Sequence, residues 1–454
     1  MNRIESFLKS NLYLILIYGL SFLGFISRNE YQSYNLYVTI FLLFLLSIIL
    51  ILFKNTVYAV PILFAIMYGY NLKNPNLNTI DGFDFIYLIP LFLFSSIIIH
   101  IVRFKPKFRV GVLTKPYFWI AVAYIASIFY VNITSTYLQL SLVGFLYLII
   151  YQFFRQTVKT DESYMMRLLF FASLLLVAEL AFHIGLGFFN FNLDKSLTER
   201  LSLGMSNIWY NGDFGWANLN EVVIQIILLL GSHFYFIVKY PKNILFWIFP
   251  LLTIFIIFIS ASRGGYISLG ISLLIYLVYI INTKNKWAIL NMTYILLIVG
   301  LLMYQFRTVI EIAIQTFAQG GLDNIDFFST SRISLYRNAM DVYRKFPVFG
   351  GGWEALVDFE NPDRIQVFHS TFFHTLAVMG TFGFIVLIYY FKQSFKFLLT
   401  NKSLHKSMIL VGVFASQMHG LIDNTMYMLV YTLSTLWIFS MLESIDDQRS
   451  NPTK

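Results

Sequence analysis

The stretch LYVTIFLLFLLSIILILF, from Leu36 to Phe53, decides the fold class because it is a long apolar run without a single charged residue. A helix needs about 20 consecutive, predominantly apolar residues to cross the hydrocarbon core of a bilayer. Comparable runs extend from Ile244 to Ser260 and from Trp287 to Tyr304. The sequence therefore predicts an integral membrane protein with several spanning helices.

The composition of the whole chain agrees with a membrane protein. Of the 454 residues, 58% are hydrophobic, 19% are aromatic and only 12% are charged, which is far from the average of soluble domains. The absence of cysteine excludes disulfides, thiolate metal sites and cysteine nucleophiles. A net charge of +9 can indicate a nucleic-acid ligand, but in a membrane protein the distribution of Lys and Arg among the loops is more informative. We expect no nucleic-acid partner.

Apolar runs along the chain predict an all-α, polytopic membrane protein with about 12–14 transmembrane helices, the third and thirteenth runs being short. The first run follows a basic start but lacks a cleavage site of the A-x-A type, so it is interpreted as a retained span and not as a signal peptide. The predicted spans are 11–27, 36–53, 56–70, 85–102, 116–133, 136–154, 168–189, 219–238, 244–260, 265–281, 287–305, 368–391, 408–420 and 424–442.

Positive charge is unevenly divided between the two sets of loops. With the N-terminus inside, 21 of the 32 Lys and Arg residues fall on the inner side and 11 on the outer side. The cluster from Arg103 to Lys115 alone is costly to translocate. The positive-inside rule therefore predicts that both termini are cytoplasmic.

Two outer segments are longer than simple connectors, 190–217 and 306–367. The second contains an amphipathic helical pattern from Arg332 to Phe346. Ser329, Thr330 or Ser331 can cap its start, and Pro347 with Gly350 to Gly352 ends it. We expect this helix to lie against the membrane surface. No internal repeat or linker is evident, so the prediction is a single membrane domain, 1–454, with 306–367 as a long extracytoplasmic loop.

Arg263 lies in a short outer turn, SASRGG at 260–265, at the start of the next helix. Free backbone N–H groups at a helix N-terminus favour an anion, and a guanidinium binds two phosphate oxygens at once. Gly264 and Gly265 allow the backbone to approach such a ligand closely. The alternative is an arginine that reaches lipid headgroups.

Arg332 repeats this arrangement in the first turn of the predicted loop helix. Arg337 and Arg344 follow on the same helix, on a neighbouring face. Alternatively, each of these arginines is simply a charged side chain exposed to solvent.

His369 stands where the chain re-enters the membrane, in HSTFFH at 369–374. An imidazole titrates near neutral pH, which makes His369 the best general-base candidate. His374 is five residues further and is turned away on a helix, which argues against a metal pair. Either histidine alone is also compatible with a hydrogen-bonding role at the membrane interface.

Further polar groups lie in or next to the predicted spans and are functional candidates because ionisable groups are costly in lipid. The residue pattern assigns them no role. They are Glu179, His183, Glu221, His419 and Asp423. No Walker A motif, dinucleotide fingerprint or cysteine metal motif occurs, so nothing indicates nucleotide-driven work.

From Ser260 to Leu387 the sequence resembles the O-antigen ligase and polymerase family of bacterial envelopes. The similarity lies in the order and spacing of short motifs on the predicted outer face. Ser370 departs from it, since this position is commonly asparagine in the family. The motifs are SRGG at 262–265, SRISLYRNAM at 331–340, FPVFGGGW at 346–353, HSTFFHTLAVMG at 369–380 with Phe382-Gly383 beyond, and FGWANLN at 214–220 upstream.

The resemblance implies a metal-independent glycosyltransferase of the bacterial cytoplasmic membrane that uses an undecaprenyl diphosphate-linked glycan and needs no cofactor. By motif, Arg263, Arg332 and Arg337 would bind the diphosphate, and His369 would activate the acceptor hydroxyl. Membrane lipid, a flippase and a chain-length regulator of the same pathway are the implied partners. The chemistry of these residues agrees with such a reaction, because fixed guanidinium groups stabilise the negative charge that develops on a leaving diphosphate.

The leading hypothesis is a polymerase that joins repeat units of capsule, exopolysaccharide or O-antigen. The chain is rich in Ile, Phe, Tyr, Asn and Lys and lacks cysteine, a composition typical of AT-rich coding in organisms that often have no outer membrane. The close alternative is a ligase that moves finished glycan onto lipid A core or another acceptor. A transporter or flippase is a third hypothesis, for which internal repeats and a polar path through the bundle are typical.

Overall fold

The computed structural model describes residues 2–27, 32–69, 79–80, 83–84, 88–129, 131, 133–189, 219–260, 262–305, 307, 311, 332–356 and 367–450. In these ranges the regular secondary structure is helical except for a two-stranded antiparallel pair, β1 (Thr79–Ile80) and β2 (Phe83–Asp84), and loops join the helices. The all-α prediction is confirmed. The predicted outer segment 190–217 and the predicted caps Ser329 to Ser331 lie outside the described residues.

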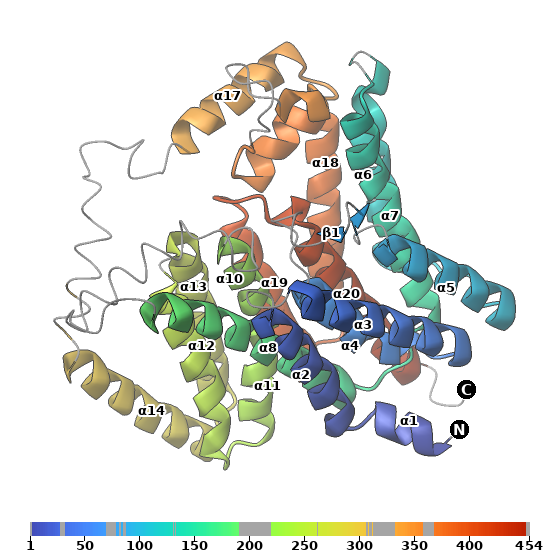
Figure 1. Cartoon of the computed structure of the whole chain (residues 1–454). Helices are drawn as coiled ribbons and strands as arrows, with labels where there is room; N and C mark the ends of the chain where they lie inside the picture. Colours follow the sequence, from blue (N-terminus) through green and yellow to red (C-terminus); the bar gives the residue numbers. More distant parts are fainter. Residues whose placement is uncertain are drawn as a thin grey trace. The chain divides into compact units, whose positions relative to one another are not determined.

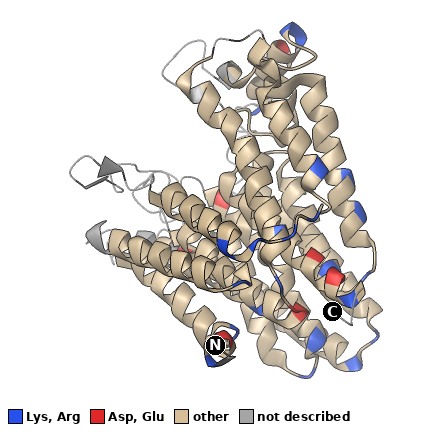
Figure 2. Cartoon of the chain, turned by 90° about the vertical axis from the view of Figure 1, so that its right-hand side faces the viewer, with Lys and Arg blue, Asp and Glu red and all other residues tan. Residues whose placement is uncertain are grey.

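Each of the fourteen apolar runs contains helix in its described residues, because a helix satisfies the backbone hydrogen bonds internally in lipid. Seven helices in the described ranges are long and apolar enough to cross a membrane, and four shorter apolar helices accompany them. Figure 2 shows that most of the helical ribbon carries no charged residue. The polytopic membrane fold is therefore confirmed, whereas the number of crossings stays a prediction.

The chain forms two compact units, each built from separate pieces of sequence. The first comprises Met1–Phe108, Gln156–Gln305 and Ser444–Lys454, and the second comprises Arg109–Arg155 and Phe306–Glu443.

In the first unit, α2 packs against α3, α4 and α8, α3 packs against α5, and α10 packs against α8 and α13 (Figure 1). Its helices are α1 (Asn2–Leu8), α2 (Asn11–Ser27), α3 (Gln32–Leu52), η1 (Thr56–Ala59), α4 (Val60–Gly69), α5 (Leu88–Phe104), α8 (Glu162–Phe189), α10 (Leu219–Leu229), α11 (Gly231–Lys239), η5 (Ile244–Trp247), α12 (Ile248–Ile259), α13 (Arg263–Asn282) and α14 (Lys286–Gln305).

In the second unit, α18 is the central element and packs against α6, α17 and α19. The helices that lie in this unit or begin in it are α6 (Thr114–Ile125), η4 (Ala126–Phe129), α7 (Ser135–Thr157), α17 (Arg332–Lys345), η6 (Trp353–Leu356), α18 (Thr371–Leu399), α19 (Leu404–His419), η7 (Thr425–Tyr427) and α20 (Leu429–Ser450).

The predicted loop helix is present as α17, and it ends at Lys345, just before Pro347. Its apolar face packs on α18, where Ala339 and Val342 are buried. The sequence pattern identified the stripe but not its partner, because amphipathicity alone does not distinguish a protein surface from a lipid surface. The position of α17 relative to a membrane stays a prediction.

Helix α18 is broken in its middle at Gly380, which has a φ of 62° and a ψ of −159°. The backbone of the turn after α17 pairs with the broken part of α18. The bonds run from the N–H of Gly351 to the carbonyl of Ala377 (2.7 Å), from Gly352 to Val378 (3.0 Å), from Thr381 to Pro347 (2.8 Å) and from Phe382 to Val348 (3.0 Å). The glycines predicted only to end α17 therefore also attach the outer loop to α18.

A buried ion pair between Arg155 and Glu443 joins α7 and α20. The Glu443 carboxylate also accepts hydrogen bonds from the Tyr151 hydroxyl and from the N–H of Val112. Since a buried charge is tolerated only with a partner and further hydrogen bonds, this cluster fixes the segment before α6 to the ends of two long helices.

Candidate functional site

The site in the second unit forms where α18 begins. Ser370 occupies the N-cap position but its side chain makes no capping bond. The backbone N–H of Ser370 donates instead to Oδ1 of Asn424 (2.8 Å). The N–H of Thr371 lies 2.8 Å from the carbonyl oxygen of Gly420 and 3.0 Å from that of Asp423. The loop between α19 and η7 therefore satisfies the first N–H groups of α18, which would otherwise have no partner.

This capping brings Asp423 to His369. Nδ1 of His369 lies 3.4 Å from Oδ1 of Asp423, and the imidazole is 37% exposed while the carboxylate is only 3% exposed. An acidic partner at Nδ1 favours the tautomer with the proton on that atom, which leaves the lone pair on Nε2. The exposed imidazole is thus arranged to accept a proton from a ligand.

The surroundings of Asp423 keep its carboxyl group ionised. Burial by itself raises the pKa of this carboxyl, but the hydrogen bond from His369, the charges of His419 and His369 and the N–H of Asn424 outweigh it. The net result is a pKa of Asp423 below its usual value. The carboxylate next to the imidazole of His369 is therefore favoured in its negatively charged form.

Tyr336 connects α17 to this site. Its hydroxyl donates to the carbonyl oxygen of His369 at 3.1 Å, and the carbonyl oxygen of Leu421 is 3.5 Å away. Its ring stacks on that of Phe373, with the ring centres 4.4 Å apart and the planes 13° from parallel. The loop helix is therefore in direct contact with the residue predicted to be the base.

Arg332, the first residue of α17, is half-buried in this region. Burial raises the pKa of the Tyr336 hydroxyl, the Arg332 guanidinium opposes this increase, and the Asp423 carboxylate adds to it. Both charged groups are therefore within electrostatic reach of the same hydroxyl. Of the predicted arginines, Arg332 lies one turn before Tyr336 on α17 and acts electrostatically on its hydroxyl, whereas Arg337 is exposed.

Arg263 belongs to the first unit, where it is the first residue of α13. Ser262 caps this helix by accepting from the N–H of Gly265 (3.1 Å), and its hydroxyl donates to Oδ1 of Asn220 (2.7 Å). A Cβ added at Gly265 would lie 2.6 Å from a methyl carbon of Val223. The glycine predicted to admit a ligand is therefore needed for the close packing of α13 on α10.

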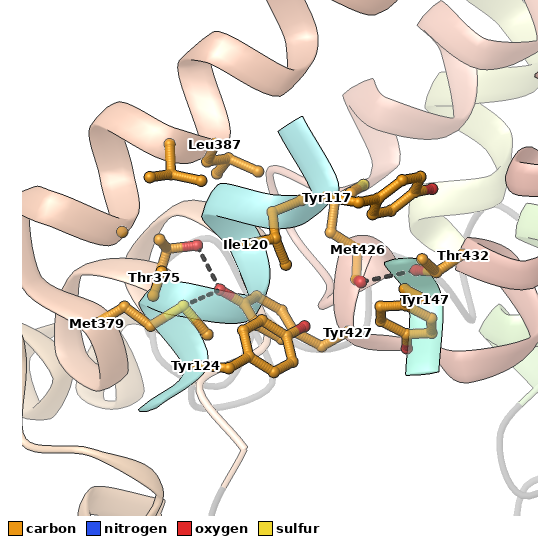
Figure 3. Close-up of a pocket in the computed structure, with 13 residues that line it drawn as sticks. Tyr117, Ile120, Tyr124, Tyr147, Thr375, Met379, Leu387, Met426, Tyr427 and Thr432 are labelled. Carbon is orange, nitrogen blue, oxygen red and sulfur yellow. Dashed lines mark hydrogen bonds between the residues drawn. The ribbon is translucent and has the colours of Figure 1, made fainter. Parts of the chain in front are cut away.

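His374 lies one turn into α18 and is buried. Its ring nitrogens have no hydrogen-bond partner among the residues that the structure describes, and its ring centre is 4.2 Å from that of Tyr427. Tyr427 and Thr375, the next residue after His374, line a mostly apolar cavity between α6, α7, α18 and η7, where they are hydrogen-bonded to each other at 2.7 Å (Figure 3). His374 therefore packs in an aromatic layer beneath the site.

The arrangement provides a base, a buried carboxylate behind it and a guanidinium nearby, which suits proton removal from a hydroxyl next to an anionic group. Within the described ranges no three His, Asp or Glu side chains are grouped in a way that could hold a metal ion.

Sequence reasoning named Asp423 without a role and did not select Tyr336 or Asn424. The available signal was an Asp-Asn pair at the outer junction of the last two predicted spans, 408–420 and 424–442. The pairing with His369 itself bridges more than fifty residues and leaves no local pattern.

Comparison with known protein families gives one match, to the O-antigen ligase family model over residues 225–388. The matched region begins in α10 and ends in α18, so it includes Arg263, Arg332, Arg337 and His369, whereas Asp423 lies beyond its end. No curated protein sequence matches the chain. Residues 225–388 of this polytopic membrane protein are therefore similar to the O-antigen ligase family.

Proposed function

We propose that the chain is the polymerase that joins undecaprenyl diphosphate-linked repeat units into capsule, exopolysaccharide or O-antigen on the outer face of the cytoplasmic membrane. The observation that carries this proposal is the pairing of His369 with Asp423 beside Arg332. It supplies a base for the acceptor hydroxyl and a cation for the leaving group. The family match supports glycan transfer in general terms.

In the proposed reaction, Nε2 of His369 removes the proton from a sugar hydroxyl of the acceptor. The hydroxyl oxygen attacks the anomeric carbon of the donor glycan, and the bond from this carbon to the diphosphate oxygen breaks. The diphosphate leaves with the electron pair, and its charge is balanced by Arg332 and, as the family motif implies, by Arg263 and Arg337. Asp423 stabilises the imidazolium that forms.

A single displacement of this kind inverts the anomeric centre. The stereochemistry of the product in a purified reaction tests this step. A retained configuration would exclude direct attack by the acceptor.

The ligase is a second candidate, because the matched family model is described as O-antigen ligase. The two functions differ in what a deletion strain accumulates. Without a polymerase the acceptor carries single repeat units. Without a ligase the finished polymer stays on its lipid carrier and the acceptor remains bare.

The test is the glycan length on gels from a deletion strain complemented with wild type, His369→Ala, Arg263→Ala or Arg332→Ala, each checked for membrane expression. Arg344→Ala is the matched control, because Arg344 is 73% exposed and pairs with Asp341 at the other end of α17. We expect long chains to disappear in the three site variants, with single repeat units still made, and to remain in the control. Normal ladders from all three variants would exclude the proposed site.

A further inference from the structure

We propose that Tyr336 is a positioning residue, which holds His369 in line with Asp423 and thereby couples the outer loop helix α17 to the catalytic base. The inference rests on the proposed function for its kinetic test. It assigns a role to the loop helix that neither the motif pattern nor the family match provides.

The first argument is the place of the Tyr336 hydroxyl. It lies between the two backbone segments that carry the pair, 3.1 Å from the carbonyl oxygen of His369 and 3.5 Å from that of Leu421. Leu421 is two residues before Asp423. A hydroxyl has one proton to donate, so the shorter bond to His369 is the main one, and Leu421 limits how far the hydroxyl can move.

The second argument is the backbone conformation of His369, whose φ is +42°. A residue other than glycine occupies this left-handed region only where its surroundings hold it there. The next two N–H groups along the chain are held by the loop at 420–424, and the carbonyl of His369 itself is held by Tyr336. Without the tyrosine hydroxyl, this peptide group is held only through the N–H of Ser370, which bonds Asn424, and the imidazole is less firmly held against Asp423.

The third argument is that the Tyr336 hydroxyl keeps its proton. Burial raises its pKa, and the nearby Asp423 carboxylate raises it further. Arg332 opposes this increase without cancelling it. The bond to the His369 carbonyl requires a donor, and the raised pKa favours the protonated hydroxyl that donates.

Tyr336→Phe isolates the hydroxyl, because phenylalanine preserves the stacking on Phe373. Tyr343→Phe is the matched control on the same helix. Thr381 donates its own proton to the carbonyl of Pro347 (2.9 Å), so Tyr343 is the donor in its 3.0 Å bond to Thr381. Each variant thus removes one hydrogen bond donated by a tyrosine of α17, but only the bond of Tyr336 reaches His369.

The kinetic measurement is elongation of lipid-linked repeat units by purified full-length protein. For Tyr336→Phe we expect kcat to fall by about tenfold to a hundredfold with KM nearly unchanged, since a small misplacement of a base costs this much. Tyr343→Phe behaves as wild type. Equal kcat values for the two variants would overturn the inference, as would a loss explained by a lower Tm alone.

A second readout does not depend on polymerase activity. Carbethoxylation of His369, followed by peptide mass spectrometry, should be faster in Tyr336→Phe than in Tyr343→Phe because the imidazole is released from Asp423. If the wild type does not elongate glycans, the proposed function is wrong, and this labelling still tests the positioning role. Equal labelling rates would contradict that role independently.

Discussion

Nδ1 of His369 lies 3.4 Å from Oδ1 of Asp423, although the two residues are separated by more than fifty positions along the chain. The backbone of the Asp423 loop caps α18 directly after His369. The same hydrogen bonds that begin the helix therefore set the distance between base and carboxylate. The loop that caps α18 therefore also fixes the geometry of the His369 and Asp423 pair.

Asp423→Asn should reduce the rate of glycan elongation by at least about a hundredfold, because an amide neither fixes the tautomer of His369 nor stabilises its protonated form. The oxygen of asparagine still accepts from the N–H of Asn424, which Asp423 does now at 2.9 Å. Folding should therefore be preserved. The measurement is single-turnover elongation, with Tm as the control, and full activity with a normal Tm would contradict the assigned role.

The same residue makes stability depend on pH. The pKa of Asp423 in the folded protein lies below its ordinary value of 3.8. Asp423 therefore contributes fully to the free energy of unfolding above pH 3.8. This contribution is lost as the pH falls from 3.8 through the lower pKa of the folded protein. Below pH 3.8, the free energy of unfolding should fall more steeply in wild type than in Asp423→Asn. Denaturation in detergent at a series of acidic pH values measures the two slopes, and identical slopes would refute the lowered pKa.

Gly380→Ala should destabilise the protein by at least about 2 kcal/mol, since its backbone conformation is almost restricted to glycine. An added Cβ would also lie 2.5 Å from the backbone nitrogen of Gly350. Gly270→Ala in α13 is the control, because no atom lies within 4 Å of its added Cβ, and alanine favours a helix by up to about 1 kcal/mol. The Tm values of the two variants are compared by thermal unfolding. Equal Tm values would show that glycine at position 380 does not contribute to stability.

Glu443→Gln should cost about 3–5 kcal/mol of stability, because it leaves the buried guanidinium of Arg155 without its anion. Replacing both members, as in Arg155→Met with Glu443→Leu, should recover much of this loss, since apolar pairs of similar size often substitute for buried ion pairs. Urea denaturation of the single and double variants measures the coupling. Strictly additive losses would mean that the pair does not act as a unit.

The sequence by itself determined the elements that depend on local pattern. The apolar runs predicted every long helix, from 11–27 to 424–442, because a helix satisfies its own backbone and needs only a continuous apolar surface. The amphipathic pattern from Arg332 to Phe346 predicted α17 almost to its ends. His369 and Arg332 were selected from short motifs in family order, and their functional roles stay predictions.

Only the tertiary structure decided what these residues contact. Asp423 obtains its role from a loop that caps a distant helix, and Tyr336 from the packing of α17 on α18. The break at Gly380 is caused by backbone pairing with the turn at 347–352. Hydrophobic periodicity describes which face of a helix is buried, but it carries no information on the partner. Contacts between residues far apart in sequence form only when the whole unit packs, and these contacts create the site.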